Sequence, residues 1–134
     1  ADASKPVRNL APPVPIDVGR VPPVAIRSDS GLAWRVLRAG AGDVRPGPDD
    51  TVVVQWSGWL PDGTLLDSTS LRGAALELPL REAPPGWAEA IQQMAPGEKR
   101  RLWVPGALDG GRHPFGAGML VYEIELMEIK PGSP

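Results

Sequence analysis

Residues 51–68 read TVVVQWSGWLPDGTLLDS, and this stretch decides the class of fold. Residues 51–60 are rich in β-branched and aromatic side chains, which favour a β-strand. Pro61 and Gly63 then mark a turn, because proline presets φ at the first turn position and glycine accepts a positive φ. Residues 64–67 return from that turn. The stretch therefore predicts a β-hairpin.

Alternating apolar and polar residues predict further strands on both sides of the hairpin. These strands cover residues 32–37, 76–80, 98–104 and 119–129. The segment from Trp87 to Ala95 is expected to be a helix: Trp87, Ile91 and Met94 recur at i, i+4 and i+7, and Pro96-Gly97 ends the pattern. The helix would cover the apolar face of an antiparallel sheet. We therefore expect an α+β fold with about five antiparallel strands and one short helix.

Residues 1–30 differ from the rest of the chain because they carry six prolines and no regular apolar period. Proline lacks a backbone donor and biases its predecessor towards extended conformations. We expect a proline-rich arm or linker at residues 1–30, one domain at 31–130 and a tail at 131–134. Two interpretations of the arm remain open: a tether or disordered tail, and a segment that packs on the domain through residues 21–26.

The composition excludes several classes of site. The 134-residue chain has no cysteine and one histidine, which excludes thiol catalysis, zinc–thiolate sites and multi-histidine metal sites. We expect neither a metal nor a cofactor. A net charge of −2 argues against a nucleic-acid-binding module, because such a module needs a cationic field. No apolar run approaches the roughly 18 residues that a membrane-spanning helix needs.

Four segments of the chain resemble FKBP-type peptidyl-prolyl isomerases. They are GLAWRVLRAGAG at 31–42, the pattern VxVxWxGxLxDGxxLDS at 52–68, PGWAEAIQQMAPGEKRRLWVP at 85–105 and LVYEIELMEI at 120–129. The resemblance implies a strongly bent sheet wrapped around the short helix, with an apolar pocket between them. It also implies that the protein catalyses rotation about the Xaa-Pro bond. That reaction needs no nucleophile, because an apolar pocket can bind the twisted amide better than the planar one.

The resemblance also implies which residues form the pocket. Trp87 corresponds to the tryptophan of the pocket floor, Trp56 to a wall tyrosine and Tyr122 to a pocket phenylalanine. Asp67 corresponds to the acid at the pocket edge, and Arg72 is placed to pair with it. The alternatives are plain core packing for the aromatic residues and an Asp-Ser turn cap for the acid. The expected catalytic residues are Asp67, Tyr122 and Trp87, and the expected substrate-binding residues are Trp56, Leu66, Arg72, Leu76, Ala83, Pro84, Trp87, Asp109, Phe115 and Tyr122.

Two positions depart from the family pattern. Pro84 lies three residues before Trp87, where the family usually offers a backbone N–H to the bound peptide, and proline has none. Asp109 stands where the family keeps a tyrosine hydroxyl aimed at the ligand carbonyl, and a carboxylate cannot donate there. Phe115, in the loop between residues 110 and 119, is the candidate for the missing apolar flap.

Two functions therefore remain open. The first is a peptidyl-prolyl cis-trans isomerase of reduced activity that assists protein folding by binding Xaa-Pro segments. The second is a catalytically weak or inactive FKBP-fold binding or chaperone module for proline-containing or apolar partner segments. A further hypothesis is that the pocket is filled by its own side chains or by the proline-rich arm through residues 21–24.

The expected partners are proline-containing polypeptides and, with weakened affinity, FKBP-directed macrolides. We expect no nucleic-acid partner. The proline-rich arm and the lack of cysteine favour an extracytoplasmic location, with the cytoplasm left open. A monomer is the default expectation.

Overall fold

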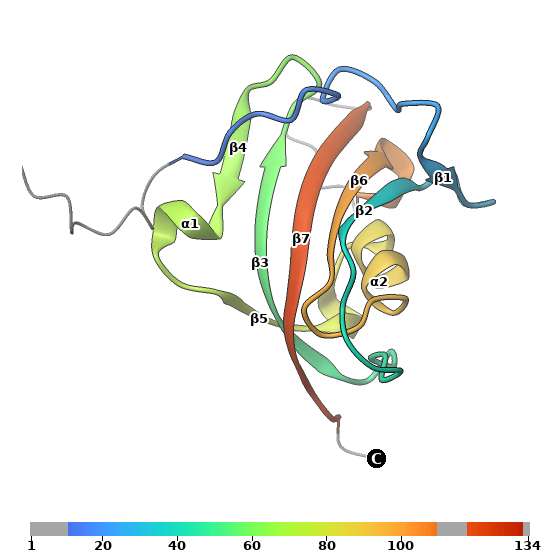
Figure 1. Cartoon of the computed structure of the whole chain (residues 1–134), viewed down its shortest axis with the longest axis vertical. Coiled ribbons are helices and arrows are strands. Elements are labelled where there is room, and N and C mark those ends of the chain that lie inside the picture. The colour runs from blue at the N-terminus through green and yellow to red at the C-terminus, as the bar shows by residue number, and fades with distance from the viewer. Residues whose placement is uncertain (1–10, 110–117, 133–134) are drawn as a thin grey trace, which may run out of the picture.

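The computed structural model describes residues 11–109 and 118–132. In these residues the chain forms one antiparallel sheet with the strand order β1-β2-β6-β7-β3-β4, and β5 also pairs with β3 (Figure 1). The strands are β1 (Ile26–Arg27), β2 (Ala33–Arg38), β3 (Thr51–Trp59), β4 (Leu65–Ser68), β5 (Leu76–Pro79), β6 (Lys99–Pro105) and β7 (Met119–Lys130). The helices are α1 (Thr69–Arg72) and α2 (Pro85–Ile91), and 3-10 turns lie at Leu80–Glu82 and Gly106–Leu108.

The sheet has seven strands where about five were expected, because short segments pair at its edges. β1 adds two residues beside β2, while β4 and β5 pair with successive parts of β3. The hairpin of β3 and β4 lies where the sequence placed it, and Gly63 in its turn has a φ of +92°. The one-turn helix α1 follows β4 directly and was not expected.

The inner face of the sheet is the face that α2 covers (Figure 1). β7 lies between β3 and β6, so both of its edges are hydrogen-bonded. From Leu120 to Leu126 every second side chain of β7 points to the inner face and is buried there. The core residues of β7 and α2 are Leu120, Tyr122, Ile124, Leu126, Trp87, Ala90 and Ile91.

The helix α2 runs from Pro85 to Ile91, and the expected bounds of Trp87 to Ala95 are therefore wrong. Proline is accepted at the first helical position because its missing N–H has no partner there anyway. The chain then tightens into i→i+3 hydrogen bonds, in which the N–H of Met94 donates to the carbonyl of Ile91 (3.0 Å). Met94 still reaches the core, which explains why the apolar period extends beyond the helix.

Gly86 lets the start of α2 approach β6 closely. A Cβ atom at this position would lie 2.8 Å from Cγ1 of Val104, closer than side chains pack. The glycine therefore allows the helix to press against the sheet directly before Trp87, and it helps to set the depth of that side chain.

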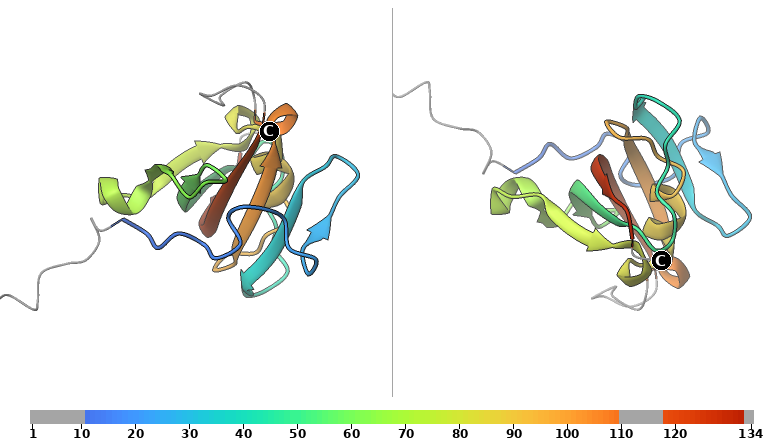
Figure 2. Two further views of the ribbon diagram at one scale, coloured as in Figure 1. Left: turned by 90° about the horizontal axis from the view of Figure 1, so that it is seen from above. Right: turned by 90° about the horizontal axis from the view of Figure 1, so that it is seen from below.

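Part of the arm crosses the outer face of the sheet, opposite α2 (Figure 2). The packed side chains are Val18, Val21 and Ala25 of the arm and Ala33, Trp103, Val121 and Met119 of the sheet. The hypothesis that residues 21–24 fill the pocket is therefore wrong, because Val21 packs against Trp103 on the other face. The division of the chain at residue 30 stays a prediction.

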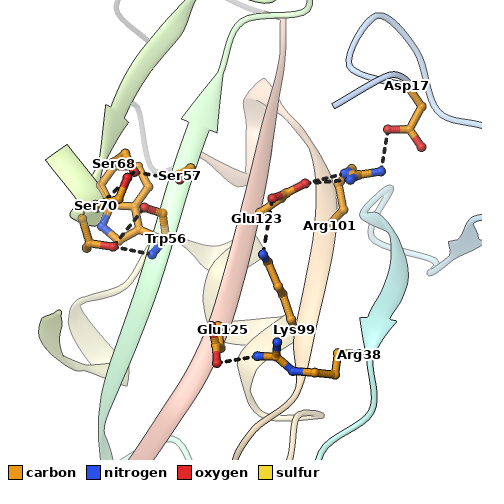
Figure 3. A network of polar contacts seen from close by, with 11 residues as sticks. Asp17, Arg38, Trp56, Ser57, Ser68, Ser70, Lys99, Arg101, Glu123 and Glu125 are labelled. Atoms are coloured by element: carbon orange, nitrogen blue, oxygen red, sulfur yellow. Dashed lines mark hydrogen bonds and ion pairs between the residues drawn. The ribbon is translucent and has the colours of Figure 1, made fainter. Parts of the chain in front are cut away.

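Asp17 fastens the arm to the sheet. Its carboxylate pairs with Arg101 (2.9 Å) and Arg35 (3.3 Å), and its backbone carbonyl accepts a hydrogen bond from the indole N–H of Trp103 (3.1 Å). Arg101 also pairs with Glu123 of β7 (2.7 Å), so one connected set of charges joins the arm, β6 and β7 (Figure 3). This set satisfies partly buried charges that would otherwise be costly.

The lower part of the outer face carries more ion pairs. Glu123 also lies 3.8 Å from the ammonium of Lys99, and Glu125 pairs with Arg38 of β2 (Figure 3). Arg100, whose side chain points to the inner side, instead pairs with buried Glu98. The basic residues 99–101 are therefore engaged in ion pairs within the protein.

No helix among the described residues is both long and apolar enough to cross a membrane.

Replacing Asp17 with alanine is expected to lower the free energy of unfolding by about 2 kcal/mol. The reason is that Arg101 loses a partly buried, charge-assisted partner. Urea unfolding followed by tryptophan fluorescence would measure the change. Asp43→Ala is the control, since Asp43 lies exposed in a turn and should leave stability within about 0.5 kcal/mol of the wild type. Equal effects of the two substitutions would contradict a fastening role for Asp17.

Candidate functional site

An apolar cavity of about 210 Å³ lies between the inner face of the sheet and the start of α2. Its lining residues come from β3, β5, β7 and α2, elements far apart in the sequence. They are Trp56, Leu76, Leu78, Pro84, Trp87 and Tyr122. A cavity with this lining accepts a small apolar group such as a proline ring.

Three aromatic rings from three elements meet at this cavity. The ring of Trp87 stands edge-on to Trp56 at 5.1 Å and to Tyr122 at 5.2 Å between ring centroids. The rings of Trp56 and Tyr122 are 6.0 Å apart. These distances lie in the range where aromatic pairs attract beyond simple burial. The expected grouping of the three side chains is therefore present in the structure.

Gly58 makes room for one of these rings. It pairs with Tyr122 across β3 and β7, and a Cβ atom on it would lie 2.9 Å from Cε1 of that tyrosine. The tyrosine ring therefore lies directly over the backbone of β3. A larger residue at position 58 would push the ring towards the cavity.

Asp67 and Arg72, which the family resemblance placed in reach of each other, form an ion pair. Nη2 and Nε of Arg72 both donate to the carboxylate of Asp67. The backbone N–H of Ser68 donates to the same carboxylate (2.7 Å). The hydrogen bond from the Arg72 guanidinium lowers the pKa of Asp67 below its ordinary value. The N–H of Ser68 and the charge of Arg72 act in the same direction, while burial opposes them.

Asp109 ends the 3-10 turn before residue 110 and is fully buried. Its Oδ1 accepts a hydrogen bond from the hydroxyl of Tyr122 at 3.2 Å. The sequence placed Asp109 among the residues that contact substrate. In the structure its carboxylate contacts the hydroxyl of Tyr122, and Asp109 itself is not among the residues that line the cavity.

Pro84 is buried, precedes the first residue of α2 and lines the cavity. Leu66 and Ala83 are partly buried and pack on the core next to the cavity, and neither lines it. Leu78 lines it and was not predicted, although its alternation with Leu76 already placed both on one strand face. Phe115 lies outside the described residues.

No group of three or more metal-ligating side chains comes together among residues 11–109 and 118–132. The cavity itself offers apolar surface and the aromatic rings of Trp56, Trp87 and Tyr122.

A family model described as "FKBP-type peptidyl-prolyl cis-trans isomerase" matches residues 42–127. The chain belongs to this family. The FKBP resemblance and the α+β fold predicted from the sequence are therefore confirmed. Among solved structures, FkpA from Escherichia coli superimposes with a TM-score of 0.75 at 34% identity, over 81% of this chain and 53% of that one.

Curated relatives agree with this assignment. The FKBP-type 22 kDa peptidyl-prolyl cis-trans isomerase of Escherichia coli is 40% identical over 76% of this chain and 52% of its own length. "Outer membrane protein MIP" of Legionella longbeachae is 36% identical over 75% of this chain and 45% of its own. The chain therefore spans about half the length of the curated relatives it matches.

The Asp67–Arg72 pair should make stability depend on pH. A carboxyl whose pKa is lowered by folding adds stability above its unfolded pKa of about 3.9 and loses it as the pH falls through the folded pKa. We therefore expect Arg72→Ala to destabilise the protein at pH 7 and to cost much less at pH 2.5. Urea unfolding at both pH values would measure this.

The control for this comparison is Arg81→Ala. Arg81 is exposed and forms no ion pair within the described residues. Its removal is expected to change stability equally at both pH values. A cost of Arg72→Ala that stays the same at pH 7 and pH 2.5 would contradict the stabilising role of the ion pair.

Proposed function

We propose that this domain is a peptidyl-prolyl cis-trans isomerase that assists folding by binding Xaa-Pro segments. The observation that carries the proposal is the apolar cavity closed by Trp56, Trp87 and Tyr122, in a chain of the FKBP family. The cavity volume suits a proline ring, and the flat face of an indole is a good surface for it. Catalysis then requires that the bound, twisted imide be favoured over the planar one.

The barrier to Xaa-Pro rotation is lost amide resonance, about 18–20 kcal/mol. In the twisted state the carbonyl is less polarised, so it loses less on transfer from water to an apolar site. Trp87 and Tyr122 would hold the proline ring, and Trp56 and Leu76 would exclude water from one side. The carboxylate of Asp67, held by Arg72, would add a fixed charge at the edge of the site.

The structure gives two reasons to propose reduced activity. Pro84 lines the cavity and has no N–H to donate to a bound peptide. Asp109 accepts a hydrogen bond from Tyr122 and supplies no hydroxyl of its own. A net hydrogen bond is worth about 0.5–1.5 kcal/mol, so each missing donor costs up to about tenfold in rate. These same observations favour the second candidate, a binding or chaperone module with little turnover.

We further propose proline-containing polypeptides as partners and an extracytoplasmic location. The location is supported by the name of one relative, "Outer membrane protein MIP", and by the proline-rich arm. FKBP-directed macrolides are expected to bind weakly, because the missing donor at Pro84 affects them as it affects peptides. A monomer remains the proposal for the oligomeric state.

A protease-free cis/trans relaxation assay on a Leu-Pro-Phe peptide tests the proposed activity. The wild type should accelerate relaxation, and Trp87→Leu should lower kcat/KM at least about tenfold, since the pocket loses its floor. Trp103→Leu is a matched control, because it removes a buried tryptophan from the outer face. It should lower stability while the folded protein keeps its activity. Relaxation no faster than in buffer, with peptide binding retained, would establish the binding module instead.

Pro84→Ala should raise kcat/KM by up to about tenfold, because it restores a backbone N–H at the cavity. Alanine can adopt the φ of −55° and ψ of 147° found at this position, so the change needs no rearrangement. Pro85→Ala is the control, since Pro85 is exposed and does not line the cavity. Equal activity of the two variants would contradict the idea that a missing donor limits the reaction.

A further inference from the structure

The carboxylate of Asp109, which accepts a hydrogen bond from Tyr122, is buried, and carboxylates are rarely found fully buried. Asp109 has 0% of its surface exposed, and Tyr122, which lines the cavity, has 7%. A buried carboxylate is costly unless its oxygens accept hydrogen bonds. Here one of them accepts the phenolic proton at 3.2 Å. This hydrogen bond links the buried carboxylate directly to a side chain that lines the cavity.

The direction of this hydrogen bond limits what Tyr122 can do for a substrate. The phenol of Tyr122 donates its single proton to Oδ1 of Asp109. That proton is then directed away from a substrate carbonyl. What Tyr122 presents to the cavity is therefore the edge of its ring.

The same hydrogen bond completes the support of the tyrosine ring. One side of the ring lies over the backbone of Gly58, where even a Cβ atom would not fit. The edge-on contact with Trp87 at 5.2 Å limits its movement on the cavity side. Asp109 holds the hydroxyl end, and its own backbone N–H is tied to the carbonyl of Gly106 (3.2 Å) in the 3-10 turn.

We propose that Asp109 is a positioning residue for the isomerase reaction: it fixes the ring of Tyr122 as a wall of the pocket and does not itself touch substrate. The catalytic part of this inference rests on the proposed function. The pocket then selects its substrate by apolar fit, without a hydrogen bond from Tyr122 to the carbonyl. This assigns Asp109 a different role from the substrate contact that the sequence predicted.

Two single variants and their combination distinguish positioning from substrate contact. Tyr122→Phe leaves the Asp109 carboxylate without the phenol, and Asp109→Leu leaves the phenol without the carboxylate, so each should lower kcat/KM about tenfold. The double variant removes both polar partners of the contact and fills the space with apolar groups. It should be at least about threefold more active than either single variant. A double variant no more active than Tyr122→Phe alone would overturn the proposal, because the hydroxyl would then act on substrate directly.

Asp109→Asn is the conservative comparison. The amide oxygen can still accept the phenolic proton, so kcat/KM should stay within about threefold of the wild type. A loss as large as that of Asp109→Leu would overturn the positioning role, because the charge and not the contact would then matter.

A second measurement does not depend on isomerase activity. Tyr122 is the only tyrosine of the chain, so ¹³C-labelled tyrosine gives one set of ring signals in NMR spectra. The hydroxyl-bearing ring carbon should shift, and ring rotation should accelerate, in Asp109→Leu but not in Asp109→Asn. Identical tyrosine signals in the wild type and Asp109→Leu would overturn the proposal. If the wild type fails to isomerise the peptide, the proposed function fails, while these signals still decide whether Asp109 positions the ring.

Discussion

Trp87 enters the inner face of the sheet from the first turn of α2, edge-on to Trp56 and to Tyr122. Most of the remaining structure depends on this contact. The side chain joins α2, the longest helix of the described residues, to strands β3 and β7, and it forms part of both the hydrophobic core and the cavity. Burying a tryptophan contributes several kcal/mol, a large share of the stability of a small domain. The site and the core therefore cannot be altered independently at this residue.

Three residues near the pocket allow the rings of Trp87, Trp56 and Tyr122 to meet. Pro85 starts the helix two residues before Trp87, and Gly86 brings the helix against Val104. Gly58 leaves space over β3 for the tyrosine ring. Each of these residues is small or conformationally restricted, and each lies next to an aromatic residue of the pocket. The shape of the pocket therefore depends on the glycines at positions 58 and 86 as well as on the aromatic rings.

The outer face shows that the proline-rich arm contributes to packing. Trp103 and Val121 point away from α2 and would be exposed without the arm residues that cover them. The ion pairs of Arg101 with Asp17 and Glu123 (Figure 3) connect to this apolar cluster through the hydrogen bond from Trp103 to the carbonyl of Asp17. A bent sheet with an apolar inner face and a partly apolar outer face needs covers on both sides. In this protein α2 supplies one of them and the arm the other.

Local signals in the sequence were sufficient to predict the hairpin of residues 51–68, the central strands and the approximate place of the helix. A proline, a glycine and an alternating period act within a few residues, so their effect does not depend on the rest of the chain. The motifs also identified the family and most of the pocket. The bounds of α2 were wrong because Met94 continues the apolar period after the helix has ended. Leu78 was missed as a pocket residue although its strand was correctly placed.

Only the tertiary structure decided which distant side chains meet. Asp17 and Arg101 are 84 residues apart along the chain, and no local pattern links them. The partner of Tyr122 likewise depends on how the 3-10 turn after β6 lies against β7, and the face that the arm covers depends on the bend of the whole sheet. The sequence by itself determined the strands, the helix and the apolar residues, because these follow from backbone preference and periodicity. Pairing of charges and direction of hydrogen bonds required the folded chain, because both depend on distances that only packing sets.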